Sequence, residues 1–474
     1  MKKSVKVVVL MLAALVLGYY GYTAYQNSSS LKGVVHQDAV SVVKIGIHDI
    51  KKTLMLDALS APSYYYKNSG SSRSKAKDDN KASTGKGVEL MPHNLLFFTM
   101  PDVGNTLFTV FKIYDSNDFQ TFINNEIAGK VRTDKNDGPE GYQLAFFKNR
   151  NIALAWNSEK LAVALAPKIE NQSVVHVFEE LLVGEKTISD TNHPLLSAIK
   201  SLEAHVVYTN GKGVSGLTFE DGSAVLKGAH QADSPFAKEI TVPSYANSSL
   251  SFHYDLNLTE ASIKEEFAKR LSNLPFFGKN NLDPSKIIQP LDGSLSFSIA
   301  GRTVQKDTAI TYGYDDNFEK IAQKTVQEKE VPVLHLDLGL QEQKLQHYFS
   351  EVGALSENGI FEPFPLYQLK LVEQSSRAGF STEHDTIVPQ QKVSSYFFNV
   401  QTDFQRLQQD LAIAQTQELF SVLYNMRVQA WQEAENEIQV EGNINAVEDH
   451  INILSQVFFA LNKKEDPAAK EPEL

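Results

Sequence analysis

The chain has 474 residues, of which 42% are hydrophobic, 10% aromatic and 22% charged. This composition can build a sizeable core and excludes a wholly disordered protein. The formal net charge of −12, with no basic stripe, argues against a nucleic-acid-binding protein. The absence of cysteine excludes disulfides, thiolate metal sites and cysteine nucleophiles.

The N-terminus predicts a membrane anchor. Three lysines in residues 1–6 precede an uncharged apolar run, 7–25, which as a helix would span roughly 30 Å, about one hydrocarbon core. The basic stub is expected in the cytoplasm and the rest of the chain across the membrane. We therefore expect a single-pass protein of a bacterial inner membrane, with its C-terminal domains in the periplasm.

Cleavage of this segment is the alternative to an anchor. A signal peptide ending at Ala24 would release an exported soluble protein, but Tyr22 stands where a small side chain is needed. A lipoprotein signal would require a cysteine, which the chain does not have. The uncleaved anchor is the favoured interpretation.

Composition shifts predict the domain organisation. After the anchor we expect, in order, a spacer, a first α+β domain, a linker, a second α+β domain and a disordered tail: 26–38, 39–230, 231–249, 250–462 and 463–474. Within the first domain, 64–87 is almost free of apolar residues after its tyrosines. It is predicted to be a disordered insertion or a long exposed loop.

Short apolar runs separated by polar turns predict strands in the first domain. The expected strands are 40–47, 94–100, 106–114, 142–147, 152–156, 161–166, 214–219 and 223–228. Asp221–Gly222 is a two-residue hairpin signal between the last two. A helix is expected over Val175–Val183.

The second domain shows the same mixture. Alternation predicts strands through Leu295–Ile299 and Tyr367–Leu371. It also predicts a long strand with one face formed by Phe420, Val422, Tyr424, Met426 and Val428, and a hairpin partner that contains Ile438 and Val440. Asn445 and Glu448 form an expected capping box for a last helix. Its expected buried stripe is Val447, Ile451, Leu454, Phe458 and Leu461.

One local plan, a strand, a polar cap and an amphipathic helix, recurs. It is clearest in Phe111–Ile127 and Phe397–Leu411, where Thr402 and Gln405 form an expected capping box. Looser copies occupy Val42–Leu59, Ser251–Leu271 and Leu334–Val352. Irregular spacing excludes a solenoid. The expected fold is α+β, with antiparallel sheets that carry helices on one face, in two tandem domains behind a membrane helix.

These features resemble a group of large, uncharacterised envelope proteins of bacteroidete bacteria, built as tandem α+β domains behind an export signal. The likeness rests on the basic N-terminus and anchor, Ala39–Ile47, the FKIYDSNDFQTF unit, the LDGSLSFSI strand and the closing Glu437–Leu461 pair. Many members carry a lipoprotein cysteine, which this chain lacks. The resemblance implies fold and location, and offers no catalytic residues.

The chain contains no HExxH, Walker A, GxGxxG or GxSxG motif. Asp134–Glu140 alternates oxygen ligands as a calcium loop does, but it is interpreted as an ordinary turn. Asp115, Asn117 and Glu126 occupy EF-hand positions, but Phe119 and Gln120 stand where a ligand and a glycine are needed. His193 and His205 share no ligand spacing.

The remaining acidic residues also have structural interpretations. Asp315, Asp316 and Glu319 could act as an acid–base pair or hold a cation, but a cap for a short helix at 318–324 is favoured. Two Glu–Lys/Arg pairs four residues apart, Glu265–Lys269 and Glu266–Arg270, predict a solvated helix face. No catalytic, cofactor-binding or metal-binding residue is predicted, and no cofactor.

Three functions follow in order of preference. The first is a non-enzymatic periplasmic envelope protein with a protein-binding or scaffold role, held to the membrane by its N-terminal helix. The second is a periplasmic module that binds a lipid or another apolar envelope ligand in a groove. The third is a hydrolase with a dispersed site, which no local motif supports.

Overall fold

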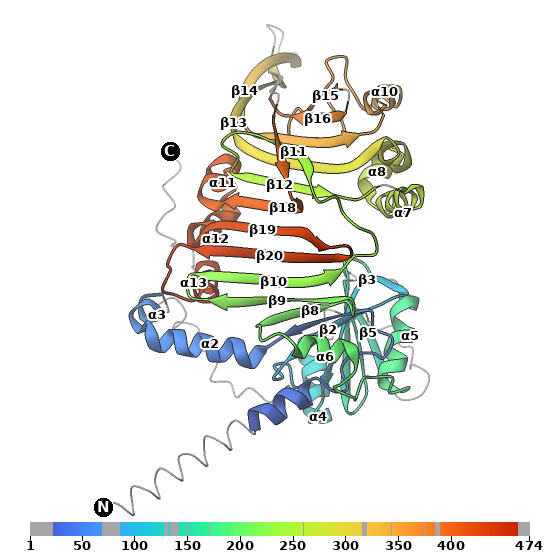
Figure 1. The fold of residues 1–474 in the computed structure, drawn as a ribbon, viewed down its shortest axis with the longest axis vertical. Helices are drawn as coiled ribbons and strands as arrows, with labels where there is room; N and C mark the ends of the chain where they lie inside the picture. The colour runs from blue at the N-terminus through green and yellow to red at the C-terminus, as the bar shows by residue number, and fades with distance from the viewer. Residues whose placement is uncertain are drawn as a thin grey trace, which may run out of the picture. The chain divides into compact units, whose positions relative to one another are not determined.

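The computed structural model describes residues 22–68, 86–127, 131–132, 142–147, 149, 151–169, 171–258, 260–314, 320–342, 344–374, 376–383 and 389–462. The described chain divides into two compact units, the first formed by 22–221 and 226–230, and the second by 222–225 and 231–462. Each unit combines helices with antiparallel strands, which confirms the α+β class (Figure 1).

Several expected segments lie outside the described residues. These are the stub at 1–6, most of the anchor at 7–25, the part of the insertion from 69 to 85, and the tail at 463–474. Among the helices of the described residues, none is both long and apolar enough to cross a membrane. The start of the expected insertion is helical, because Tyr64–Asn68 belongs to helix α3 (Pro62–Asn68).

The sheet of the first unit, the first sheet, is antiparallel throughout. Its strand order is β9-β8-β1-β2-β3-β7-β6-β5-β4. The bounds are β1 Ser41–Ile45, β2 Leu95–Met100, β3 Val103–Lys112, β4 Val131–Arg132, β5 Gln143–Phe147, β6 Ile152–Trp156, β7 Lys160–Leu165, β8 Val206–Thr209 and β9 Gly213–Glu220. β9 pairs with β10 (Ser223–Gln231), so the predicted strands and the Asp221–Gly222 hairpin are confirmed.

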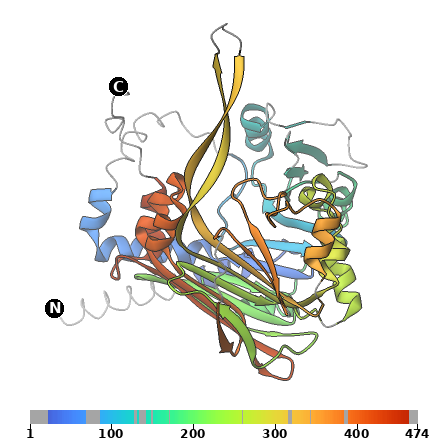
Figure 2. The same ribbon diagram turned by 90° about the horizontal axis from the view of Figure 1, so that it is seen from above.

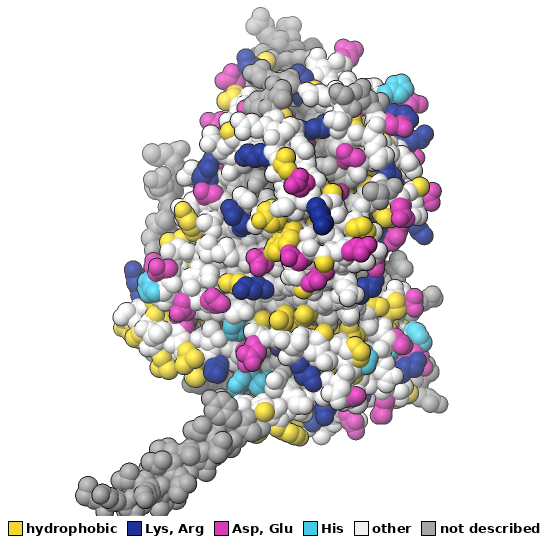
Figure 3. Space-filling view, in the orientation of Figure 1, with side chains coloured by type: hydrophobic (Ala, Val, Ile, Leu, Met, Phe, Trp, Pro, Cys, Tyr) yellow, Lys and Arg dark blue, Asp and Glu magenta, His cyan; other side chains and the backbone are white. Residues whose placement is uncertain are grey.

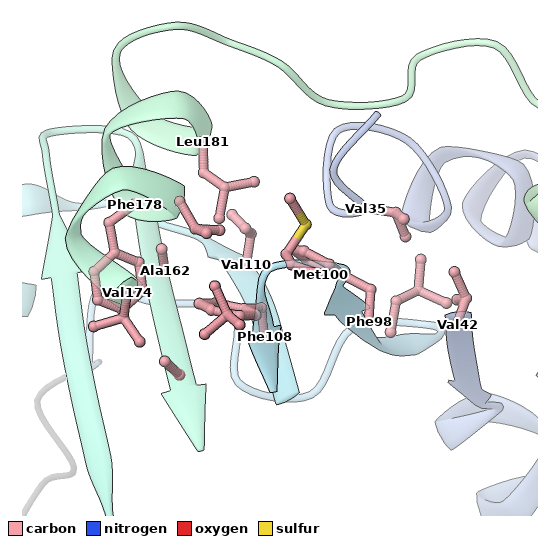
Figure 4. Close-up of a cluster of buried hydrophobic side chains, with 14 of the residues drawn as sticks. Val35, Val42, Phe98, Met100, Phe108, Val110, Ala162, Val174, Phe178 and Leu181 are labelled. Atoms are coloured by element: carbon pink, nitrogen blue, oxygen red, sulfur yellow. The ribbon is translucent and has the colours of Figure 1, made fainter. Parts of the chain in front are cut away.

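Part of the first sheet is covered on both faces, whereas helices were expected on one. Ala162 faces helix α5 (Asn171–Leu182), where Phe178 is fully buried (Figure 4). Ala153 belongs to the same cluster. The neighbouring residues Leu154 and Val163 face a second cluster around Phe119 of helix α4 (Ser116–Phe122). Strands buried on both faces read as nearly continuous apolar runs, which is the pattern of β6 and β7.

The expected spacer contributes to this core. Leu31 and Val35 are only 1% and 0% exposed and belong to the same cluster as Phe98 and Phe108. His36 forms an isolated antiparallel bridge with Thr187. This part of the expected spacer therefore packs against the first unit. Helices α2 (Ile47–Ser60) and α6 (Pro194–Lys200) complete this unit.

The sheet of the second unit, the second sheet, has the order β20-β19-β18-β12-β13-β14-β16-β15, and every pair is antiparallel. The bounds are β12 Leu250–Asp255, β13 Leu291–Tyr314, β14 Lys320–Leu340, β15 Lys370–Gln374, β16 Arg377–Ser381, β18 Tyr396–Asp403, β19 Leu423–Ala434 and β20 Glu437–Ala446. β11 (Ile240–Ser244) and β17 (Gln390–Ser394) form a separate two-stranded ribbon. The expected linker therefore contains a strand.

The helices of the second unit are α7 Ala261–Ser272, α8 Pro275–Lys279, α9 Pro284–Ile288, α10 Leu345–Glu351, α11 Phe404–Leu411, α12 Gln417–Val422 and α13 Ile453–Leu461. Side chains of α7, α8, α9 and α10 pack with apolar residues of its sheet. Leu345 and Phe349 of α10 pack with Phe380 and Leu371 of the sheet. A strand followed by a helix is confirmed at all five expected places. A side-chain cap forms at two of them, through Asp115 and Asp403, whereas α2, α7 and α10 begin without one.

Two predicted caps are wrong. Asp403 caps α11 by accepting the backbone N–H of Arg406, so the expected box of Thr402 and Gln405 does not form. The last helix begins at Ile453 with Asn452 as its cap, whereas Asn445 lies within β20. That helix starts seven residues later than expected and buries Ile453, Ser455, Gln456 and Ala460, whereas Phe458 and Leu461 are exposed by 57% and 64%.

Two predicted elements also differ. Phe420 and Val422 lie in α12, so the long strand begins only at Leu423. Residues 320–324 of the expected short helix belong to β14, while Asp315, Asp316 and Glu319 lie outside the described residues. In both cases pairing with a neighbouring strand fixes where the strand starts, and local apolar spacing does not report that pairing.

Candidate functional site

The two faces of the second sheet have opposite chemistry. Directly paired residues in neighbouring strands lie on the same face. One row across the sheet is apolar and consists of Val428, Val400, Phe252, Phe297, Leu336, Phe380 and Leu371. We call this the apolar face.

The opposite face carries polar side chains from one strand to the next. One row runs through Gln429, Asn399, His253, Ser296 and Asp337, and the neighbouring row through Arg427, Gln401, Ser251, Ser298, His335, Ser381 and Lys370. We call this the polar face. Ser296, Ser298, His253, His335 and Asp337 are each at most 5% exposed, so these polar groups are buried and require partners.

The β11–β17 ribbon covers the polar face and encloses two cavities with it. Pro243 and Tyr245 line both cavities. The Asp337 cavity, of about 510 Å³, is lined by His335, Asp337, Arg377 and Ser381 among others. The His253 cavity, of about 530 Å³, is lined by His253, Ser298 and Asn399 among others. Both volumes are in the range of small-ligand sites. Figure 3 shows the surface on the side seen in Figure 1.

A hydrogen-bonded cluster organises the Asp337 cavity. The Tyr245 hydroxyl donates to Asp337 Oδ2 at 2.8 Å, and Arg377 Nη2 forms an ion pair with Asp337 Oδ1. The His335 ring stacks on the Tyr245 ring with 3.8 Å between centroids and 2° between planes. A Cβ at Gly379 would lie 3.3 Å from Asp337 Oδ1, so the glycine leaves room for the carboxylate.

Burial controls the ionisation of this cluster. Burial raises the pKa of Asp337, although the Arg377 guanidinium and the Tyr245 hydroxyl oppose that shift. Burial also raises the pKa of Tyr245, and the neighbouring Asp337 adds to the shift. Burial lowers the pKa of His335 to about 4. At neutral pH the His335 imidazole is therefore neutral, and it lies beside the Asp337–Arg377 ion pair.

His335 also contacts Ser381, which invites comparison with a hydrolase site. His335 Nδ1 lies 3.1 Å from Ser381 Oγ, and His335 Nε2 lies 3.8 Å from Glu383 Oε2, which is too long for a hydrogen bond. Ser381 Oγ accepts the backbone N–H of Glu383 at 3.0 Å. An imidazole with a pKa near 4 is a weak base at neutral pH. The geometry favours a structural network over an activated serine.

The sequence search did not find these residues. His205, which it considered, is held by Thr53 Oγ1 at 2.8 Å and by the Phe219 N–H at 3.0 Å in the first unit. Asp115 caps α4. Residues 134–140 lie outside the described residues. Among the residues described, no group of three His, Asp or Glu is placed to hold a metal ion. A signal for this site is present in the sequence of β12, β13 and β14, where serines and histidines alternate with apolar residues and so lie together on one face.

The second candidate site is a long β-hairpin arm. β13 and β14 pair continuously from Arg302–Pro332 to Tyr314–Lys320, beyond the last residues that pair with β12 and β16. We call residues 302–314 and 320–332 the β13–β14 arm. Figure 2 shows its two strands twisting around one another as they extend from the second sheet.

The base of the arm is fixed to the second unit. Gln305 is 4% exposed, and its Nε2 donates to the carbonyls of Gln368 and Thr382, both at 2.8 Å. Its Oε1 accepts the Gln368 N–H at 2.9 Å. Val304, which precedes Gln305, and Val326, which pairs with Thr308, are exposed by 52% and 63%. The arm therefore starts from a rigid base and presents apolar side chains to solvent.

Comparisons with known proteins identify no family. No family model matches the chain, and no curated protein matches it. A comparison with solved structures finds the crystal form I structure of TP0453, at 8% sequence identity, over 73% of this chain and 88% of that chain, with a TM-score of 0.19. A TM-score this low carries no argument about fold or function.

Proposed function

We propose that this chain is a non-enzymatic envelope protein that binds a partner protein through its β13–β14 arm. In this proposal the 7–25 segment anchors the chain in the inner membrane and both units lie in the periplasm. The basic stub, the apolar run and the resemblance to bacteroidete-type envelope proteins support the location. The observation that carries the binding role is the arm itself.

The arm has the physical properties of a docking element. A two-stranded ribbon without a third strand or a helix against it is only marginally stable in water. Among the described strands, none pairs with the outer edges of the arm, so the backbone groups there can pair with a strand of another protein. Exposed Val304 and Val326 add apolar surface. A partner that adds a strand or covers these valines would stabilise the arm.

Site-specific photo-crosslinking in the native envelope tests this proposal. A photoreactive phenylalanine at Val326 should crosslink one discrete protein, which mass spectrometry would identify at the arm. Leu274, which is 49% exposed in the second unit, is the matched control position and should give no such product. Equal crosslinking from both positions, or none from Val326, would contradict the docking role.

A lipid or other apolar ligand is the second candidate, and the apolar face of the second sheet favours it. Phe252, Phe297, Phe398 and Val400 are only partly buried there. Phe398 makes edge-to-face contacts with Phe252 and Tyr254, at 5.8 and 5.7 Å between centroids. Partly exposed aromatic residues at the centre of a sheet are suited to cover an acyl chain.

Native mass spectrometry of the full chain tests the lipid candidate. A bound lipid of defined mass should be present, and Phe398→Asn should reduce its occupancy. Phe458→Asn, on the exposed side of α13, is the control and should leave the occupancy unchanged. A chain that carries no lipid after gentle extraction would rule out this candidate.

A further inference from the structure

The His253 cavity has an unusual charge balance for this chain. Its described lining contains Lys392 and Arg406 but no aspartate or glutamate, although the chain as a whole has a net charge of −12. Hydroxyls and side-chain amides make up most of the remaining polar lining, from Ser251, Ser296, Ser298, Asn399, Gln401 and Gln429. A cavity of about 530 Å³ with this lining is suited to a polar ligand that carries negative charge.

Two buried polar atoms of the lining have no partner. His253 and Ser298 are each 5% exposed, and neither His253 Nε2 nor Ser298 Oγ makes a hydrogen bond among the described residues. A buried polar group left without a partner costs about 1–3 kcal/mol. Both residues belong to the polar face and line the same cavity. A ligand that bonds to them would recover this cost.

Neighbouring groups hold the unpartnered atoms in position. Ser296 Oγ lies 2.8 Å from His253 Nδ1, so when the serine donates this bond the imidazole proton lies on Nε2 and is available to a ligand. Asn399 Oδ1 accepts from Gln429 Nε2 at 3.1 Å and from Gln401 Nε2 at 3.3 Å. The Asn399 amide N–H groups then remain for an acceptor in the cavity.

The cations are placed differently from the hydroxyls. Lys392 lies on the exposed β17 side of the cavity and makes no ion pair among the described residues. Arg406, at the start of α11, donates from Nη2 to the carbonyl of Asn247 and has further donors. An anionic group would be bound at this charged side, and neutral hydroxyls would bond to His253 and Ser298 on the sheet.

We propose that the His253 cavity binds a small hydroxylated anion, namely a carboxylate or a phosphate carried on a sugar-sized polar body. The charge balance selects the anion, and the two unpartnered atoms select the hydroxyl groups. An acyl chain is disfavoured because it would leave both atoms unsatisfied. The inference does not rest on the β13–β14 arm, so it stands or falls separately from the proposed function.

Isothermal titration calorimetry of the full chain tests this inference, with glucose 6-phosphate, glucuronate, glucose and inorganic phosphate as probes. We expect glucose 6-phosphate or glucuronate to bind at least tenfold more tightly than glucose and inorganic phosphate. A preference between the two anions separates phosphate from carboxylate recognition. The weakest binding that would still support the proposal is a Kd of about 1 mM, which corresponds to −4.1 kcal/mol. Glucose that binds as tightly as the sugar anions would overturn the proposal. The absence of binding by either sugar anion at a concentration about tenfold above that Kd would overturn it as well.

Matched variants locate the binding. Lys392→Gln, on the surface, should weaken binding of the sugar anion about tenfold, and Ser298→Ala should weaken it about two- to tenfold, as expected for one hydrogen bond. Ser381→Ala, in the Asp337 cavity, is the control and should have no effect. Binding that both His253-cavity variants leave intact would overturn the proposal, and thermal melting of Ser298→Ala would verify its fold.

Discussion

Asp337 is a buried acidic residue that forms an ion pair with Arg377. The Asp337 side chain is 7% exposed and the Arg377 side chain 20%. We expect Arg377→Met to lower the free energy of unfolding of the second unit by about 3–5 kcal/mol, because it leaves a buried charge unpaired. Urea unfolding followed through Trp431 in a Trp156→Phe background would measure this.

The exposed Glu266–Arg270 pair on α7 is the control for that experiment. Its side chains are 64% and 75% exposed, so Arg270→Met should cost less than about 1 kcal/mol. In addition, Asp337→Leu combined with Arg377→Met should recover much of the loss, since no buried charge remains. Equal effects of the two single variants would show that Asp337 is not held as a buried anion.

His253 and His335 predict loss of stability in mild acid. Burial lowers the pKa of both from 6.5 to about 4. Between these values the unfolded chain binds more protons than the folded chain, so stability falls as the pH drops from about 6.5 to about 4. Each histidine accounts for roughly 3 kcal/mol at the acid end of this window.

His335→Gln tests the acid prediction. His335 faces Tyr245, Ser381 and Glu383. The variant should be less stable at pH 7.5 because its packing and hydrogen bond change, yet lose less stability than the native chain between pH 6.5 and pH 4. Urea unfolding across this range would measure the slopes. An unchanged slope would mean that His335 is not protonated on unfolding.

At the scale of elements, two neighbouring residues, Thr402 and Asp403, are candidates for the N-cap of α11, and only Asp403 caps it. Asp403 accepts the Arg406 N–H at 3.0 Å, whereas Thr402 is 5% exposed and its hydroxyl makes no hydrogen bond among the described residues. Asp403→Ala should cost about 1 kcal/mol. Thr402→Val should be neutral or stabilising, because it replaces a buried hydroxyl without a partner. If urea unfolding showed a larger loss of stability for Thr402→Val than for Asp403→Ala, Thr402 and not Asp403 would be the cap.

Strands and the strand–cap–helix plan could be predicted because their signals are local. Polar turns between short apolar runs identified β5, β6 and β7, and the polar residues after β3 identified the start of α4. The errors occurred where two local solutions compete. Thr402 and Asp403 can both cap a helix, and the period of Phe420–Val428 fits a strand although its first part is helical.

The candidate site could not be predicted, because it is made by register between distant strands. His253, Ser296, Asp337 and Asn399 come from β12, β13, β14 and β18, which are separated by up to well over a hundred residues. No local spacing links them. In the sequence each one is only a polar residue between apolar neighbours, and only pairing brings them to one face.

At the scale of the whole molecule, the account proposes a chain held at the membrane by its N-terminus that meets its partner through one arm. Gln305 fixes the base of the arm, and its two strands remain paired as far as Tyr314 and Lys320. Binding energy at such an arm would come from backbone pairing and a few apolar contacts. Loss of the arm should therefore remove the partner and leave both units folded.

The most direct test is co-purification of the full chain from its own membranes with and without the arm. In the shortened variant, Thr308–Val326 is replaced by Asn-Gly, a two-residue turn that joins the paired residues Asp307 and Gln327. The account predicts that one envelope protein co-purifies in stoichiometric amount with the native chain and not with the variant. The membrane location of the variant and the free energy of unfolding of its second unit should be unchanged. The same partner retained by the folded variant would contradict the account.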